Sequence, residues 1–133
     1  MEVANQRVLG IGVDVVETAR IESSLERFGD RFLERVFTDE EIAYCNSMKY
    51  PARHYAARFA AKEAVSKAFG TGIGGTTGWK EIEVKRKESG EPYIQLHGAA
   101  QKHAEELQVV TVFASLSHSD NYSVANAVVT VRA

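Results

Sequence analysis

An alanine-rich segment that runs into a glycine-rich one constrains the fold more than any other stretch of this chain. Residues 58–69 read RFAAKEAVSKAF, and residues 70–75 read GTGIGG. Alanine and the other strong helix formers predict a helix that ends where the glycines begin. The side chains on its alanine side are small enough for another backbone to approach closely, so the helix is expected to pack tightly against a neighbouring element.

The charged residues of this predicted helix lie on two neighbouring ridges when the side chains are placed at about 100° per residue. The ridges consist of Phe59, Glu63 and Lys67, and beside them Arg58, Lys62 and Ser66. The simplest interpretation is a surface helix with a solvated charged face. The alternative is a functional site, in which case the rest of the chain must supply partners for the one carboxylate, Glu63.

The composition is that of an ordinary soluble domain. The chain has 133 residues, of which 44% are hydrophobic and 26% are charged, so we expect residues 1–133 to form one domain. A net charge of −2 gives no overall attraction for nucleic acids or membranes, and neither is expected as a partner.

Two further observations limit the class of protein. Cys45 is the only cysteine, which excludes an intrachain disulfide and a cysteine-rich metal site. The first residues are polar and do not resemble a signal peptide, and no apolar stretch is long enough to span a membrane. We therefore expect a cytoplasmic protein.

Residues 8–16 (VLGIGVDVV) predict a buried strand that carries an unusual charge. Gly10 and Gly12 would let another element approach the backbone closely. Asp14 lies inside the apolar run, where a carboxylate must be paired, hydrogen-bonded or bound to a metal. The alternative is that Asp14 ends the strand and caps the following helix.

Residues 17–36 predict one helix, or two helices that meet near Gly29 and Asp30. An apolar stripe, a stripe of arginines and a separate stripe of acidic residues run along this segment. The arginine stripe consists of Arg20, Arg27, Arg31 and Arg35. It is either a solvated helix face or a docking surface for an acidic partner, and a break at Gly29 would weaken the second interpretation.

The remaining elements mix helices and strands. Thr38 and Glu41 match a capping box that opens a short helix through Cys45. The long helix that contains residues 58–69 is expected to begin at His54, which we interpret as a surface residue. After the glycines the pattern predicts a hairpin of residues 80–86 and 93–96, a helix over 97–107, and strands over 109–117 and 122–131.

Asp14 and Glu63 together have the chemistry of a magnesium site. Magnesium commonly uses one or two carboxylates, and waters and substrate phosphate complete its coordination. Matching phosphate binders are available nearby on the predicted helix and in a turn between strands. These candidates are Arg58, Lys62, Lys67, Ser117 and His118.

The order of the elements excludes two common nucleotide-binding folds. The glycines of a P-loop follow a strand and precede the helix that carries the lysine, whereas here the helix and its lysines come before residues 70–75. Residues 10–14 lack the third glycine of a dinucleotide fingerprint. What remains is phosphate chemistry without a covalent protein nucleophile.

Several motifs, at this separation and in this order, resemble one known family. They are Gly10-Ile11-Gly12-Val13-Asp14, Arg58-Phe59-Ala60-Ala61-Lys62-Glu63-Ala64 with Lys67, Gly70-Thr71-Gly72-Ile73-Gly74, Gly90-Glu91-Pro92 and Ser115-Leu116-Ser117-His118. The chain closely resembles holo-[acyl-carrier-protein] synthase, the small bacterial branch of the 4′-phosphopantetheinyl transferases. The likeness runs from about residue 8 to the C-terminus.

The resemblance implies a fold, an assembly and an activity. The fold would be α+β, with an antiparallel sheet packed against a long central helix. The assembly would be a homotrimer with active sites at subunit boundaries. The reaction would transfer 4′-phosphopantetheine from coenzyme A to a serine of apo acyl carrier protein, giving holo carrier protein and adenosine 3′,5′-bisphosphate.

The same resemblance implies roles for individual residues. Asp14 and Glu63 would bind Mg²⁺ and, with Lys67, form the catalytic group. Our own hypothesis for the base that takes the serine proton is Glu63 or a metal-bound water that it holds, and the water is favoured because a metal-bound carboxylate has little basicity to spare. The coenzyme A site would be lined by Arg58, Lys62, Lys67, Gly70, Thr71, Gly72, Ser117 and His118. The arginine stripe would dock the carrier protein, chiefly through Arg20 and Arg31.

Two other functions would use the same residues. A non-catalytic module could capture acidic proteins or nucleotides with the arginine stripe. A magnesium-dependent hydrolase could act on nucleotide phosphates with the two carboxylates and the cations. Only the transferase would modify a carrier protein covalently.

Overall fold

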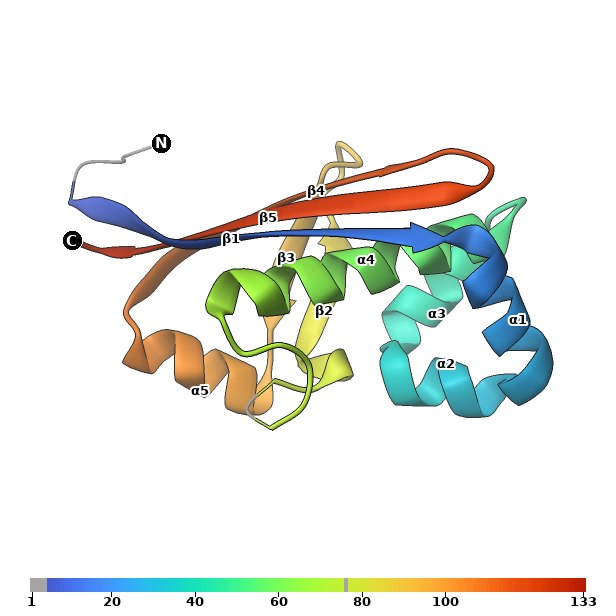
Figure 1. The fold of residues 1–133 in the computed structure, drawn as a ribbon, viewed down its shortest axis with the longest axis horizontal. Coiled ribbons are helices and arrows are strands. Elements are labelled where there is room, and N and C mark those ends of the chain that lie inside the picture. The colour runs from blue at the N-terminus through green and yellow to red at the C-terminus, as the bar shows by residue number, and fades with distance from the viewer. Residues whose placement is uncertain (1–4, 76) are drawn as a thin grey trace.

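The computed structural model describes residues 5–75 and 77–133, and Figure 1 shows how their helices and strands are arranged. The strands are β1 (Gln6–Glu17), β2 (Ile82–Arg86), β3 (Pro92–Leu96), β4 (Val109–His118) and β5 (Tyr122–Arg132). The helices are α1 (Thr18–Phe28), α2 (Asp30–Val36), α3 (Asp39–Asn46), α4 (Pro51–Phe69) and α5 (Gly98–Glu106), and a 3₁₀ turn, η1 (Trp79–Glu81), precedes β2.

Two antiparallel sheets and the long helix α4 form the frame of the molecule. Strands β1, β5 and β4 make a sheet in that order, and β2 pairs with β3 as a hairpin. Helix α4 runs along the three-stranded sheet (Figure 1), and the buried core lies between them. The predicted α+β architecture, an antiparallel sheet against a long central helix, is confirmed.

Gly10 and Gly12 let α4 lie directly on β1. A Cβ atom on Gly10 would collide with the carbonyl oxygen of Ala68, and one on Gly12 would collide with that of Ala64. Successive side chains of a strand point to opposite faces, so Asp14 lies on the same side of β1 as the two glycines. The close packing that the sequence predicts for the alanine side of the helix is therefore confirmed.

Helix α4 is buried on nearly all sides, so the interpretation of a solvated charged face is wrong. Arg58, Lys62 and Ser66 are as buried as the alanines, whereas Glu63 is half-buried and Lys67 is exposed. The sheet covers one side of the helix, and α1, α3 and β2 contact it elsewhere. A helical pattern identifies neighbouring ridges, but it does not say which of them the rest of the chain will cover.

The ends of α4 are set by a proline and a glycine. The helix begins at Pro51, earlier than the predicted start at His54, because proline is favourable at the first helical position, where its fixed φ is helical and no N–H is needed. Gly70 ends the helix with a φ of 82°, in the left-handed region.

The segment before α4 follows the sequence signals closely. Gly29 separates α1 from α2 with a φ of 52°, which glycine adopts readily, so the two-helix alternative is confirmed. Helix α3 begins with the predicted capping box, in which Thr38 and Glu41 bind each other's backbone N–H groups.

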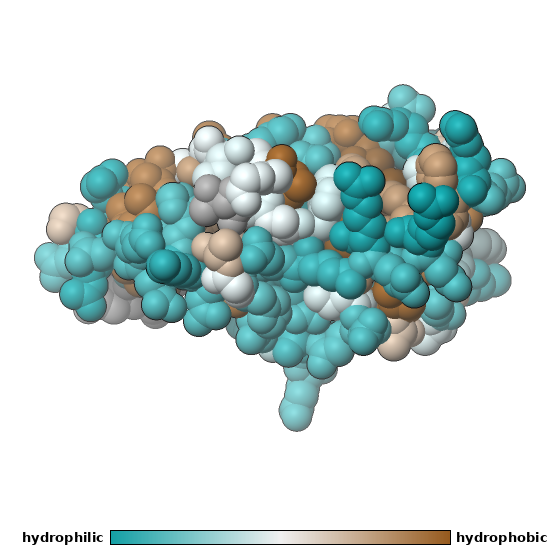
Figure 2. All heavy atoms as spheres, turned by 90° about the horizontal axis from the view of Figure 1, so that it is seen from below, coloured by the Kyte–Doolittle hydropathy of each residue, from teal (hydrophilic) through white to brown (hydrophobic). Residues whose placement is uncertain are grey.

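The surface opposite the three-stranded sheet is mainly hydrophilic. Figure 2 shows this face from below, with apolar residues in separate patches among hydrophilic ones.

Among the residues that the structure describes, no helix has the length and apolar character needed to cross a membrane. The cytoplasmic location and the single domain over residues 1–133 stay predictions.

A buried carboxylate joins β2 to the start of α3. The Glu83 side chain is 7% exposed and lies 2.8 Å from Nε2 of His97. It also accepts a hydrogen bond of 2.7 Å from the hydroxyl of Thr38. Burial raises the pKa of Glu83, but these two hydrogen bonds and the charge of Lys85 outweigh burial, so its pKa lies below the ordinary value.

We expect Gly12→Ala to destabilise the protein, because the added Cβ must push α4 away from β1. Overpacking of a tight contact costs about 1–3 kcal/mol, which should lower the midpoint of urea unfolding. Gly78→Ala is the matched control, since a Cβ there would lie 3.4 Å from the flexible side chain of Glu81. An unchanged midpoint for Gly12→Ala would contradict the packing described above.

We expect acid to weaken the protein partly through Glu83. A carboxyl with a lowered folded-state pKa contributes stability above its unfolded value of 4.5 and loses it as the pH falls through the folded value. Glu83→Gln should therefore lower the free energy of unfolding at neutral pH and make its decline below about pH 4.5 shallower. Urea unfolding at a series of pH values checks this, with exposed Glu91→Gln as the control. A decline as steep as in the unchanged chain would refute it.

Candidate active site

Asp14 and Lys67 form an ion pair between β1 and α4. The Nζ atom of Lys67 lies 3.0 Å from Oδ1 of Asp14, and it also donates to the carbonyl of Val13 at 3.2 Å. The Asp14 side chain is 19% exposed and that of Lys67 is 49% exposed. Asp14 thus has the partner that a carboxylate in an apolar strand requires.

The alternative interpretation of Asp14 as a helix cap is wrong. Asp14 lies within β1, opposite Ala125 of β5. Helix α1 begins at Thr18, and Glu17 occupies the cap position without a side-chain hydrogen bond. Asp14 is therefore free to act at the surface between β1 and α4.

Glu63 adds a second carboxylate to this group. It is half-buried on α4, one turn before Lys67. Burial raises the pKa of Glu63, the negative charge of Asp14 raises it further, and Lys67 partly opposes both effects. The two carboxylates therefore repel each other, and a single ammonium group compensates for only one of them.

Asp14 and Glu63 fit a magnesium site in which the substrate supplies part of the coordination. Within residues 5–75 and 77–133, no cluster of three or more histidine, cysteine, aspartate or glutamate side chains could hold a metal. The protein would supply two carboxylates, and waters and a phosphate would supply the rest, which is common for Mg²⁺. A divalent cation here would also cancel the repulsion between the two carboxylates.

The glycine loop begins at the end of α4 that carries Lys67. The N–H of Gly70 donates to the carbonyl of Lys67, and the N–H groups of Thr71 and Gly72 both donate to the carbonyl of Ser66. These bonds cap the helix, so the three amides are engaged within the chain in this arrangement. A coenzyme A contact by Gly70, Thr71 and Gly72 stays a prediction.

The structure does not bring Lys62 to the two carboxylates. Its ammonium donates to Oε1 of Glu41 at 2.8 Å and to the carbonyls of Trp79 and Ile82 at 3.0 and 2.6 Å. An ammonium has three hydrogens, so none is left for a phosphate. Burial lowers the pKa of Lys62, and Glu41 opposes this. The predicted contact of Lys62 with coenzyme A therefore has no support in this geometry, because the Lys62 ridge faces the core.

Arg58 belongs to a second, cationic group. Its Cζ lies 4.4 Å from the centre of the Tyr44 ring, and Cζ of Arg86 lies 4.8 Å from the same ring. Arg58 is 4% exposed, and its Nε has no hydrogen-bond partner among the described residues. Both arginines line a cavity of about 470 Å³ together with Tyr44 and Tyr93.

His54 connects this cationic group to His118. The ring centre of His54 lies 5.9 Å from that of Tyr44 and 5.0 Å from that of His118. Burial lowers the pKa of His54, and the neighbouring charges of His118 and Arg58 lower it further. His118 and the preceding Ser117 are exposed at the end of β4. The fold therefore brings Arg58 and His118 together, as the sequence predicts for a shared site.

Three members of the cationic group are not predicted as site residues from the sequence: Tyr44, His54 and Arg86. They come from α3, α4 and β2. His54 lies one turn before Arg58 on α4, a spacing that places both on one side of the helix, and it is half-buried rather than a plain surface residue. No spacing relates Tyr44 or Arg86 to Arg58, so only their tertiary contacts reveal them.

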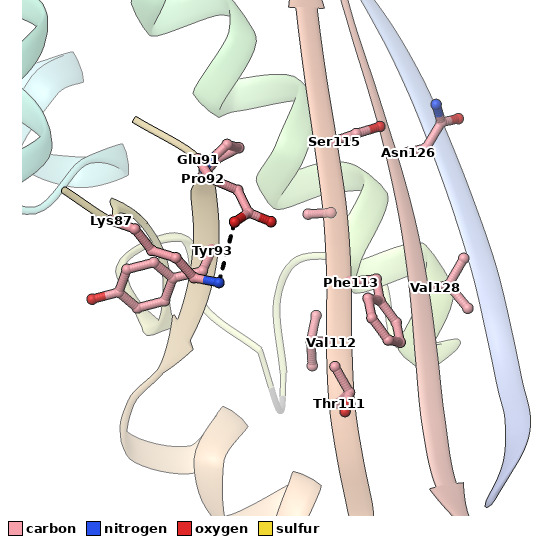
Figure 3. A pocket seen from close by; sticks show the side chains of 11 residues that line it. Lys87, Glu91, Pro92, Tyr93, Thr111, Val112, Phe113, Ser115, Asn126 and Val128 are labelled. Atoms are coloured by element: carbon pink, nitrogen blue, oxygen red, sulfur yellow. Dashed lines mark hydrogen bonds and ion pairs between the residues drawn. The ribbon is translucent and has the colours of Figure 1, made fainter. Parts of the chain in front are cut away.

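A cleft of about 430 Å³ lies beside the hairpin, between it and strands β4 and β5 (Figure 3). Glu91, which pairs with Lys87 at 3.3 Å, and Pro92 line it from the hairpin. Ser115 lines it from β4. The cleft thus joins two of the family motifs, but the predicted metal ligands do not line it.

The predicted docking arginines are all exposed, and the break between α1 and α2 divides them. Arg20 and Arg27 lie on α1, whereas Arg31 and Arg35 lie on α2. Arg31 and Arg35 line a hollow of about 280 Å³ together with Phe28. Phe28 is 48% exposed, so the hollow combines positive charge with an accessible aromatic ring.

Comparison with known proteins connects this geometry to a family. The family model described as the 4′-phosphopantetheinyl transferase superfamily matches residues 10–127. The chain belongs to this superfamily. The match includes Asp14, Glu63 and Lys67 as well as Arg58 and His118, and the family predicted from the motifs is confirmed.

Similar proteins extend over nearly the whole chain. The holo-[acyl-carrier-protein] synthase of Koribacter versatilis is 46% identical over 121 residues, which make up 91% of this chain and 97% of that protein. The crystal structure of the Neisseria meningitidis synthase has a TM-score of 0.87 and 34% identity, covering 92% of this chain and 98% of that one. The Helicobacter pylori synthase, in complex with coenzyme A, has a TM-score of 0.80 and 34% identity, covering 90% and 98%.

Proposed function

We propose that this chain transfers the 4′-phosphopantetheine group from coenzyme A to a serine of apo acyl carrier protein. The observation that carries the proposal is the group of Asp14, Glu63 and Lys67, which lies within the residues matched to the transferase superfamily. Relatives named holo-[acyl-carrier-protein] synthase support it, at 46% identity for the Koribacter protein. Coenzyme A bound to the similar Helicobacter synthase supports coenzyme A as co-substrate.

The reaction is an attack of the serine hydroxyl on the β-phosphorus of coenzyme A. A serine oxygen–phosphorus bond forms while the bond from that phosphorus to the bridging oxygen breaks, and adenosine 3′,5′-bisphosphate leaves. Lys67 neutralises negative charge that develops on the phosphorus-bound oxygens. Glu63 accepts the serine proton, directly or through one water.

Asp14 and Glu63 hold Mg²⁺ in this proposal. When bound, the ion neutralises the pyrophosphate and helps to align it for in-line attack. The charge balance of the site supports this assignment, because two carboxylates and one ammonium would otherwise present a net negative charge to an anionic substrate.

A homotrimer would combine the acidic group, made of Asp14, Glu63 and Lys67, with the cationic group around Arg58 in one site. Arg58 and Glu63 are separated by about 140° around the axis of α4, and the contacts of Arg58 run to Tyr44 and His54 instead. At a subunit boundary, the acidic group of one copy could face the cationic group of another. Arg58 and His118 would then bind the phosphates of a coenzyme A molecule that spans both copies.

The outer face of the three-stranded sheet supports such an assembly. Ile11, Val13 and Val15 alternate with the residues that face α4, and they are 72%, 53% and 60% exposed. Strand β5 lies between β1 and β4, and its Val128 is opposite both Ile11 and the exposed Phe113 of β4. Contiguous exposed apolar residues of this kind mark interaction surfaces, and we propose that copies of this chain pack through them.

The arginine stripe would dock an acidic carrier protein. Arg31 and Arg35 flank the hollow that Phe28 enters, and Cζ of Arg27 lies 5.3 Å from the centre of the Phe28 ring. Positive charge around an exposed apolar residue suits a partner whose acidic residues surround an apolar side chain. Arg20, on α1, would extend the contact.

We expect Asp14→Ala and Glu63→Ala each to reduce transfer by about a hundredfold or more, because each removes a metal ligand and Glu63→Ala also removes the base. Intact-mass measurement of apo carrier protein mixed with coenzyme A and Mg²⁺ checks this. Exposed Glu106→Ala on α5 is the matched control and should stay active. Near-full activity of either site variant would show that the two-carboxylate site is wrong.

The same assay separates the three candidate functions. A carrier protein that gains one phosphopantetheine supports the transferase. A carrier left unmodified by the unchanged chain, where a known synthase modifies it, would contradict the proposal and favour a binding module. Release of adenosine 3′,5′-bisphosphate without modification of the carrier would favour a hydrolase.

We expect Arg31→Glu to raise the KM for carrier protein by about tenfold and to leave the KM for coenzyme A unchanged, since charge reversal at a docking surface weakens one partner only. Steady-state kinetics with each substrate varied in turn measures both constants. Lys102→Glu, an equal change of charge at an exposed position of α5, is the control. Equal effects on the two substrates would argue against docking.

A further inference from the structure

The buried ion pair of Glu41 and Lys62 has no part in the proposed reaction. Both side chains are 0% exposed, and Oε1 of Glu41 lies 2.8 Å from Nζ of Lys62. Neither side chain is therefore open to solvent, although Glu41 belongs to the wall of the cavity beside Arg58. Their contribution must act through the protein itself.

Glu41 and Lys62 connect α4 to three other elements. Oε1 of Glu41 accepts from Lys62 and from the N–H of Thr38 at 2.9 Å, and Oε2 accepts from the N–H of Val84 at 2.8 Å. Lys62 in turn donates to carbonyl groups of η1 and of the first residue of β2. Every hydrogen of the ammonium is used, so α4 is tied to α3, η1 and β2 at one point.

A stability argument alone does not explain this pair. Replacing a buried ion pair by apolar residues of similar volume is often neutral or stabilising, because desolvation offsets the attraction between the charges. Charge-assisted hydrogen bonds are, however, directional. What the pair supplies and an apolar pair would not is a set of directional hydrogen bonds between α4 and its neighbours.

The orientation of α4 matters because Glu63 directly follows Lys62. Gly10 and Gly12 set how closely α4 approaches β1, and aromatic contacts of Tyr55 and Phe59 pack its other sides. The hydrogen bonds of Lys62 add directional contacts one residue before Glu63. A carboxylate about 6 Å from that axis moves about 1 Å when the helix turns by about 10°. A functional group of residues tolerates only about 0.5 Å.

We propose that Glu41 and Lys62 are positioning residues, whose buried pair holds α4 in the rotation that keeps Glu63 beside Asp14. This inference rests on the proposed function, since the carboxylates that it positions are the proposed magnesium ligands. Residues that orient metal ligands without touching the metal commonly change affinity by about ten- to a hundredfold.

The test compares Glu41→Gln, Lys62→Met and the double variant in the full-length chain. The first readout is the concentration of MgCl₂ that gives half of the Mg²⁺-induced rise in melting temperature, measured with saturating coenzyme A and no carrier protein, because the substrate phosphate completes the proposed site. The second is the KM for coenzyme A in the transfer assay. Val65→Ala, a fully buried change on the same helix, is the control for a general loss of stability.

We expect Glu41→Gln and Lys62→Met each to raise the half-saturating Mg²⁺ concentration by about tenfold. The KM for coenzyme A, measured at saturating Mg²⁺, should change by less than about twofold, and so should both readouts in Val65→Ala. If either single variant fails to fold, the double variant, which leaves no unpaired buried charge, takes its place with the same expected shift.

Three results would overturn the inference. If Val65→Ala raises the half-saturating Mg²⁺ concentration as much as the pair variants do, the pair has only a structural role. If the pair variants leave that concentration unchanged, the pair does not position Glu63. A rise in the KM for coenzyme A with Lys62→Met but not with Glu41→Gln would identify Lys62 as a phosphate binder.

The proposed function can fail separately. An unchanged chain that responds to Mg²⁺ but modifies no carrier protein would refute the transferase, while the Mg²⁺ readout would still decide the role of the pair. An unchanged chain without any Mg²⁺ response would refute both the metal site and the positioning role.

Discussion

The contact of α4 with β1 at Gly10 and Gly12 is the constraint on which the rest of the structure depends. The carbonyl groups of Ala64 and Ala68 occupy the space that side chains at these glycines would fill. Because the helix lies so close to the strand, a short carboxylate on β1 and charged residues on α4 can meet. The same alternation that turns the glycines toward the helix turns Asp14 toward it.

From this contact follows the chemistry of the candidate site. Asp14 pairs with Lys67 at 3.0 Å, and burial together with Asp14 raises the pKa of Glu63. Two carboxylates with one cation form a group that is suited to a divalent metal and a phosphate. On the other side of α4, the pair of Glu41 and Lys62 ties the helix to the rest of the fold. The site is therefore built by two kinds of contact, close backbone packing on one side and directional hydrogen bonds on the other.

The sequence predicted the elements that depend on local signals. The strand at residues 8–16, the capping box at Thr38 and the need of Asp14 for a partner are all confirmed, because each rests on nearby residues or on the cost of an unpaired charge. The predicted burial of that strand is wrong: helix α4 covers one face of β1, and Ile11, Val13 and Val15 on the other face are exposed. Lys62 could not be placed from sequence alone, because a helical pattern does not show which ridge becomes core. Tyr44 and Arg86 of the cationic group escaped prediction as well, because they lie on other elements than Arg58 and His118.

The most direct test of the central idea is the position of the metal. A crystal of the protein grown with coenzyme A and Mn²⁺ in place of Mg²⁺ would reveal the ion by its anomalous scattering. If α4 and β1 together form a metal site, the anomalous peak must lie within coordination distance of carboxylate oxygens from both Asp14 and Glu63, and in contact with the pyrophosphate. A metal bound to the pyrophosphate without either carboxylate, or held elsewhere on the chain, would contradict the account.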